Sequence, residues 1–199
     1  MQFTTLSDFL AESASKSRVS IDSTKLADLE GMTGIKTLTV TGTKPIKDDD
    51  FKYITALKDL KELFLSGVAI RDLSPLKDMK NLERLYLDET QVRDISVLKG
   101  LKNLKHLDIS DTEASDVTPL KDLKGLLWLK LGDTRVKDLT PLKGLVRLQQ
   151  LTVSGVPSDD ITPLHGLKAL RSLSIARLPI TDEKIDAIEK ALPKCVIVS

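Results

Sequence analysis

Three side chains that hydrolytic enzymes use occur at alternate positions of one short segment. They are His106, Asp108 and Ser110, within HLDIS. A nucleophilic triad needs the histidine to contact both the serine and the aspartate. Here the aspartate lies between the other two, and in an extended strand His106 and Ser110 would be roughly 13 Å apart, at ~3.3 Å per residue. This order argues against a nucleophilic site.

A metal site is a second chemical interpretation of the same region. His106, Asp88, Asp108 and Asp111 are ligand types that a cation accepts. The competing interpretation, which we favour, is ordinary acidic solvation around a surface. Cys195 is the single cysteine, and the sequence contains no GxSxG, P-loop or GxGxxG segment. We therefore expect no catalytic residue, no metal and no cofactor, and a protein that is not an enzyme.

The overall charge and hydropathy limit the possible partners. Lys plus Arg is 30 and Asp plus Glu is 29, which gives a net charge of +1 and argues against a dedicated nucleic-acid binder. No apolar run approaches the ~20 residues that span a bilayer. The N-terminal stretch lacks the basic and apolar regions of a signal peptide, so we expect a cytoplasmic protein or one exported by a signal-independent route.

An internal repeat defines the elements that would position these side chains. Segments with the pattern LxxLxLxxTxVxDLTPLKGLKx begin at Leu82, Leu104, Leu126 and Leu148, each 22 residues after the one before. Leu60, Leu170 and Leu192 continue the same spacing. Alternation along a strand places the two apolar residues of each LxL on one face. Stacked repeats bury these faces in one core, which no single repeat could do. The inward pairs are Leu85 and Leu87, Leu107 and Ile109, and Leu129 and Leu131.

The LxxLxLxx core resembles the leucine-rich-repeat signature. The DLTPL turn after each strand is similar to the short repeats of bacterial internalins and of the leucine-rich regulators of protein phosphatase one. The difference is Thr90, Thr112 and Thr134, where those families usually carry Asn; a Thr hydroxyl reaches less far along the turn. The resemblance implies an α/β fold. It would be a right-handed solenoid with a curved parallel sheet on the concave face and short helices or 3-10 turns on the convex face.

The turns and the two ends complete the expected single domain, 1–199. Ser74, Thr118, Thr140 and Thr162 each precede a proline and are predicted to cap the convex turns; Ser96 precedes Val97 instead. An amphipathic helix over 1–17 is expected to cap the first rung, Val19 to Ile21, and 18–180 hold the repeats. In 181–199, Thr181 would start a capping helix, and Cys195 and Ile197 would take the inward positions of a last strand.

The outward side chains of the sheet are the candidate binding residues. Of only seven Phe, Tyr and Trp residues in the chain, Phe64, Tyr86 and Trp128 fall on this face, with His106 between them in rung order. Exposed aromatics are enriched at the energetic centres of interfaces, and charged rims surround such centres. The remaining candidate residues are Glu62, Arg84, Asp88, Asp108 and Lys130.

We therefore predict a protein–protein interaction scaffold that binds its partner through the concave face. The chain itself is expected to be a monomer, with no nucleic-acid or membrane partner. Two alternatives stay open. One is a structural or spacer domain of a larger protein, on which this face would be inert. The other is a carbohydrate-binding surface, because aromatic rings stack on sugars.

Overall fold

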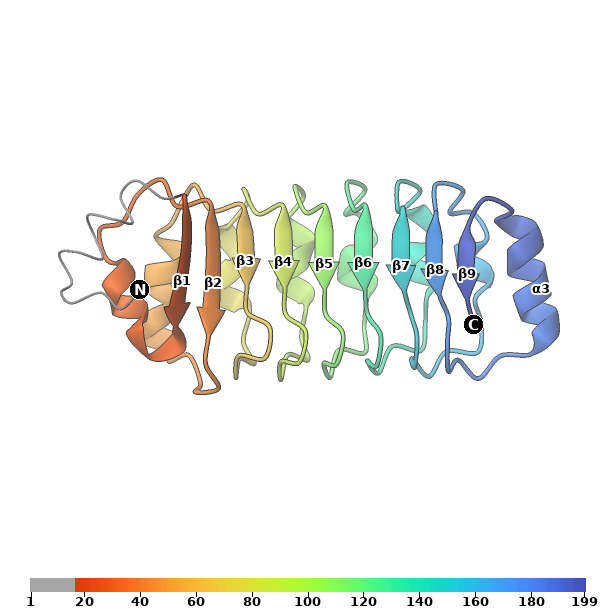
Figure 1. Cartoon of the computed structure of the whole chain (residues 1–199), viewed down its shortest axis with the longest axis horizontal. Helices are drawn as coiled ribbons and strands as arrows, with labels where there is room; N and C mark the ends of the chain where they lie inside the picture. The colour runs from red at the N-terminus through yellow and green to blue at the C-terminus, as the bar shows by residue number, and fades with distance from the viewer. Residues whose placement is uncertain (1–16) are drawn as a thin grey trace.

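Nine parallel strands form one sheet in chain order in the computed structural model, which describes residues 17–199 apart from the side chain of Asp48 (Figure 1). The strands are β1 (Arg18–Asp22), β2 (Thr37–Thr41), β3 (Glu62–Phe64), β4 (Arg84–Tyr86), β5 (His106–Asp108), β6 (Trp128–Lys130), β7 (Gln150–Thr152), β8 (Ser172–Ser174) and β9 (Val196–Val198). This confirms the predicted leucine-rich-repeat solenoid. The predicted capping helix over 1–17 lies almost wholly outside the described residues.

Short helical turns connect the strands behind the sheet (Figure 1). They are η1 (Ser23–Leu29), η2 (Asp48–Asp50), α2 (Phe51–Thr55), η3 (Ser74–Asp78), η4 (Ser96–Gly100), η5 (Thr118–Leu120), η6 (Thr140–Gly144), η7 (Thr162–Leu164) and α3 (Asp182–Ala191). Helix α3 covers the C-terminal end of the solenoid. Among residues 17–199, no helix is both long enough and apolar enough to cross a membrane.

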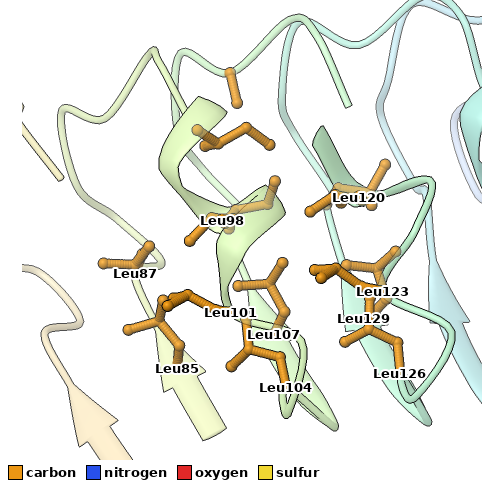
Figure 2. Packing of buried hydrophobic residues seen from close by; sticks show 14 of the residues in the cluster. Leu85, Leu87, Leu98, Leu101, Leu104, Leu107, Leu120, Leu123, Leu126 and Leu129 are labelled. Atoms are coloured by element: carbon orange, nitrogen blue, oxygen red, sulfur yellow. The ribbon is translucent and has the colours of Figure 1, made fainter. Parts of the chain in front are cut away.

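The core consists of one inward layer of leucines per rung (Figure 2). Leu85, Leu87, Leu107, Ile109 and Leu129 are all completely buried, as the alternation predicted. Leucines from the turns close the other side of each layer, so every rung packs on the rungs before and after it. Full burial of one such side chain stabilises the fold by about 1.5–3 kcal/mol.

Aspartates, rather than the predicted hydroxyl residues, cap the convex turns. The Asp72 carboxylate accepts hydrogen bonds from the backbone N–H of Ser74, at 2.8 Å, and from its hydroxyl, at 2.7 Å. These bonds lower the pKa of Asp72. The bond to the backbone recurs at 22-residue spacing from Asp94, Asp116, Asp138 and Asp160. The hydroxyl caps were wrong because each turn begins at the Ser or Thr itself, with the carboxylate two residues earlier in reach of its N–H.

Thr90, Thr112 and Thr134, at equivalent positions of three rungs, form hydrogen bonds within their own rung. Thr112 is buried, and its hydroxyl donates to the carbonyl oxygen of Ile109 at 2.7 Å. Thr90 and Thr134 make the equivalent bonds. Val68 occupies the same position in an earlier rung, where its backbone N–H donates to the Leu65 oxygen instead. The hydroxyl therefore supplies a donor that other rungs take from the backbone.

The last rung departs from the predicted register. Leu173 pairs with Ile197, two residues beyond the standard 22-residue offset. Cys195 therefore precedes β9, so its predicted inward position in that strand is wrong, although it is partly buried against the core. This burial raises the pKa of its thiol. Ile197 takes the position opposite Leu173 and is also partly buried. Thr181 stands at the N-cap of α3, as predicted, although its side chain makes no capping hydrogen bond.

Candidate functional site

Four rings line up on the outward face of β3 to β6 because the 22-residue register places them on neighbouring strands. Phe64 lies opposite Tyr86, with ring centroids 4.5 Å apart and planes within 6°. His106 lies opposite Trp128, with centroids 6.0 Å apart. The Tyr86 and Trp128 rings approach to 5.9 Å and join the two pairs. We call Phe64, Tyr86, His106 and Trp128 the aromatic strip.

The strip is half-buried rather than fully exposed, because its rings cover one another. Burial raises the pKa of the Tyr86 hydroxyl. It lowers the pKa of His106, and the nearby Arg84 adds to this effect. Both effects favour the uncharged imidazole, which extends the apolar surface of the strip. The strip presents a continuous, preformed patch of ring edges and faces.

One end of the strip is bordered by ion pairs. The Arg84 guanidinium contacts the Glu62 carboxylate, and Arg18 lies 3.9 Å from the same carboxylate. The Thr37 hydroxyl donates to Glu62 at 3.2 Å. The Glu62 side chain is only 17% exposed, so these neighbours compensate a carboxylate that has lost most of its water.

At the other end, a buried aspartate positions a lysine over the tryptophan. Asp108 is only 5% exposed, although its strand position faces outward, and its predicted binding role stays a prediction. One of its oxygens accepts from the Ser110 N–H at 3.0 Å, and the other lies 3.6 Å from the Lys130 amine. That amine lies 4.8 Å from the centre of the Trp128 ring, within cation–π range.

The residues that could have been catalytic or metal-binding make structural contacts instead. The contacts of Asp108 are to Ser110 and Lys130, and those of His106 are to Trp128. Asp88 accepts from the Ser66 hydroxyl at 2.6 Å. Within residues 17–199, no group of three His, Cys, Asp or Glu side chains is placed to hold a metal ion. The arrangement is one of packing and ion pairing on an open surface.

An ion-pair ladder beside the strip was missed at the sequence level. Glu83 accepts from Lys105 at 2.6 Å and from Lys61 at 3.0 Å, which lowers the Glu83 pKa to about 2. The signal was available, because residues 61, 83 and 105 share the 22-residue spacing and alternate in charge. The ladder ties β3, β4 and β5 together at the start of each strand.

A second missed feature is a column of left-handed residues in the loops that follow the strands. Glu89, Asp111 and Asp133 have φ values of 58°, 55° and 54°. Flanking rungs carry glycine in the same column, at Gly67 and Gly155. Their order along the solenoid places acidic side chains beside the rungs of the aromatic strip. The signal was available, because the 22-residue spacing aligns these residues with Gly67 and Gly155, and glycine is the residue that most readily adopts a positive φ.

The comparisons with known proteins agree with this architecture. A family profile described as leucine-rich repeats in two copies matches residues 58–100 and 80–122. Among solved structures, internalin C2 of Listeria monocytogenes is 33% identical, with 87% of this chain and 73% of that chain covered and a TM-score of 0.73. A search of curated proteins gives no significant match.

Two further structures share the fold at lower identity. An internalin, InlF, of Listeria monocytogenes is 24% identical over 87% of this chain and 62% of that chain, with a TM-score of 0.56. A leucine-rich-repeat protein of Leptospira interrogans is 22% identical over 86% of this chain and 50% of that chain, with a TM-score of 0.70. The chain thus spans less than two thirds of both of these proteins.

Proposed function

The chain belongs to the internalin-like leucine-rich-repeat family, and from this membership we propose that it binds a protein partner through the outward face of β3 to β6. Leucine-rich-repeat domains typically mediate protein interactions and are generally non-catalytic. The observation that carries the proposal is the aromatic strip, which gathers three of the chain's seven Phe, Tyr and Trp residues on one preformed patch.

The surroundings of the strip support a protein as the ligand. Apolar rings at the centre with ion pairs at both ends reproduce the anatomy of a protein interface, in which a dry centre is surrounded by a polar rim. Phe64 and Tyr86 stack almost parallel on each other, so each uses one ring face internally. Sugar stacking needs a free ring face, and Lys130 also covers one face of the Trp128 ring, so few ring faces remain for a carbohydrate.

The test is an affinity capture from native lysate with three versions of the full chain. Trp128→Gln introduces the residue that stands opposite it in the next rung, Gln150, and so keeps the fold. A central aromatic anchor contributes about 2 kcal/mol or more, so Trp128→Gln should weaken the captured complex about thirtyfold. Lys143→Ala on the convex side is the control and should bind as wild type.

Two results would count against the proposal. One is a partner that binds Trp128→Gln as tightly as wild type, which would move the site to the convex face or the loops. The other is that the wild-type protein captures no protein that the Trp128→Gln variant does not also capture. That second result favours the spacer interpretation. Circular dichroism of each version verifies that binding, and not folding, has changed.

A further inference from the structure

The charges on the aromatic strip are paired within the sheet itself. Glu62 is compensated by Arg84 and Arg18, and Asp108 by Lys130. A partner that covers the strip therefore meets rings and closed ion pairs, with little unpaired charge. Any preference for a positively or negatively charged partner must therefore come from the charged residues beside the strip.

The loops that follow β4, β5 and β6 supply that charge. They carry Asp88, Glu89, Asp111 and Asp133 along one long side of the strip, beginning two residues after Tyr86. Asp133 receives the Arg177 guanidinium at 2.6 Å. In the part of the chain that the structure describes, Asp88, Glu89 and Asp111 have no basic side chain within 4 Å, and Glu89 and Asp111 are exposed. Arg177, which is paired with Asp133, also attracts Asp111 from a longer distance. We call Asp88, Glu89 and Asp111 the acidic border.

The opposite long side of the strip has a different character. There Glu83 is held between Lys61 and Lys105, so its carboxylate is already compensated and one positive charge is left over. The two sides thus differ in sign, with negative charge after the strands and a weak positive charge before them. A segment bound along the strip would therefore point its basic side chains toward the loops that follow the strands.

Resting on the proposed function, we propose that the partner is a basic, apolar segment of a protein. Its apolar side chains would pack on the aromatic strip, and its Lys or Arg side chains would point toward the acidic border. Four rungs at ~4.8 Å spacing give the strip a length of roughly 14 Å, which about five extended residues cover. Electrostatic complementarity of this kind sets orientation and association rate, and apolar burial supplies most of the affinity.

The experiment is a selection of peptides from a random phage library on the immobilised full chain. The selected peptides should carry an excess of Lys and Arg next to apolar residues. Each is then synthesised with a fluorescent label, beside a version in which every Lys and Arg is replaced by Gln. Anisotropy titrations should show binding about tenfold weaker for the Gln version, and the difference should shrink as salt rises from ~50 to ~200 mM.

Matched variants separate the inference from the proposed function. Glu89→Gln with Asp111→Asn removes two charges of the acidic border and should weaken the basic peptide about fivefold to tenfold, with little effect on its Gln version. Asp78→Asn with Asp122→Asn removes two exposed charges on the convex side and should change neither. The triple variant Phe64→Thr, Tyr86→Thr and Trp128→Gln uses residue types of the flanking rungs and should abolish binding of both peptides.

The outcomes differ for the two proposals. Neutral or acidic selected peptides, or equal binding by the Glu89→Gln/Asp111→Asn variant, would overturn the basic partner and leave the strip as the site. Full binding by the triple variant would overturn both. A library that yields no peptide above background would overturn a linear basic segment as the ligand. Trp128, the only tryptophan of the chain, gives a second readout, since its fluorescence should change on binding.

Discussion

The central rungs, β3 to β6, and the outer rungs, β7 and β8, have the same interior and different outward faces. Leu107 in β5 and Leu173 in β8 are both completely buried at equivalent positions. On the outward face the central rungs carry the aromatic strip. At the same positions the outer rungs carry Gln150, Thr152, Ser172 and Ser174. The repeat therefore specifies the fold, and the departures from it on the outward face mark the proposed binding surface.

The comparison predicts equal core contributions from the two regions. Leu107→Ala and Leu173→Ala each remove a fully buried leucine, and each should lower the free energy of unfolding by about 2–5 kcal/mol. Urea denaturation followed by circular dichroism measures both values. An unchanged midpoint for Leu107→Ala would contradict the register, since a shift by one residue would turn Leu107 outward.

The outward faces, in contrast, should differ in their pairwise energies. In a double-mutant cycle, alanine substitutions at Phe64 and Tyr86 should show a coupling of about 0.5–1.5 kcal/mol, because their rings stack at 4.5 Å. The same cycle at Thr152 and Ser174, which are neighbours in the outer rungs, should give a coupling near zero. Equal couplings in the two cycles would mean that the strip has no packing energy of its own.

The buried threonines offer a third difference between rungs. Thr112→Val keeps the shape of the side chain and removes the hydroxyl that donates to the Ile109 oxygen, so it should destabilise the protein by about 0.5–1.5 kcal/mol. Val156 occupies this position in an outer rung, where its backbone N–H donates to the Val153 oxygen. Val156→Ala removes volume at the same position without removing a hydroxyl, so it measures the cost of lost packing alone. No loss of stability in Thr112→Val would show that its rung can recruit the backbone donor as well.

Much of this architecture could be predicted from the sequence, because a repeat multiplies each weak signal. The inward leucines, the strand register of the central rungs and the adjacency of Phe64 with Tyr86 all follow from the 22-residue spacing. The predictions failed where spacing carries no information. Cys195 was placed at an inward position of the last strand because the insertion in the last rung shows only in three dimensions. For Asp108, alternation predicted the outward direction of the side chain but not that it is buried.

The prediction of which residue caps each convex turn was wrong for a related reason. The sequence DLTP contains two residues able to cap a turn, and the choice between Asp and Thr depends on the residue at which the turn begins. Whether the aromatic side chains cover each other or point into solvent depends on their rotamers, which no spacing fixes. Sequence reasoning thus located the candidate site but misjudged how far it is buried. The predicted binding role of its residues remains a prediction.

The last and smallest expected effect concerns the ladder of Glu83 with Lys61 and Lys105. The outer rungs β7 and β8 lack it because they carry Gln149 and Arg171 at these positions. The Glu83 pKa in the folded protein is about 2, below its ordinary value of 4.5, because Lys105 and Lys61 donate to the carboxylate. A carboxyl whose pKa is lowered by folding stabilises the fold above its unfolded pKa. That stabilisation is lost as the pH falls from about 4.5 toward 2.

NMR titration of the Glu83 carboxyl carbon measures this shift directly. Lys105→Ala removes the larger of the two contributions and should raise the Glu83 pKa, while Lys61→Ala should raise it less. The effect of either change on stability at neutral pH should stay under about 1 kcal/mol, since both lysines are half exposed and solvent screens the pairs. Gln149→Ala, at the matching position of an outer rung, should leave the Glu83 titration unchanged. An ordinary Glu83 pKa in the wild-type protein would show that the ladder does not persist in solution, and the ladder would then no longer distinguish the central rungs from the outer ones.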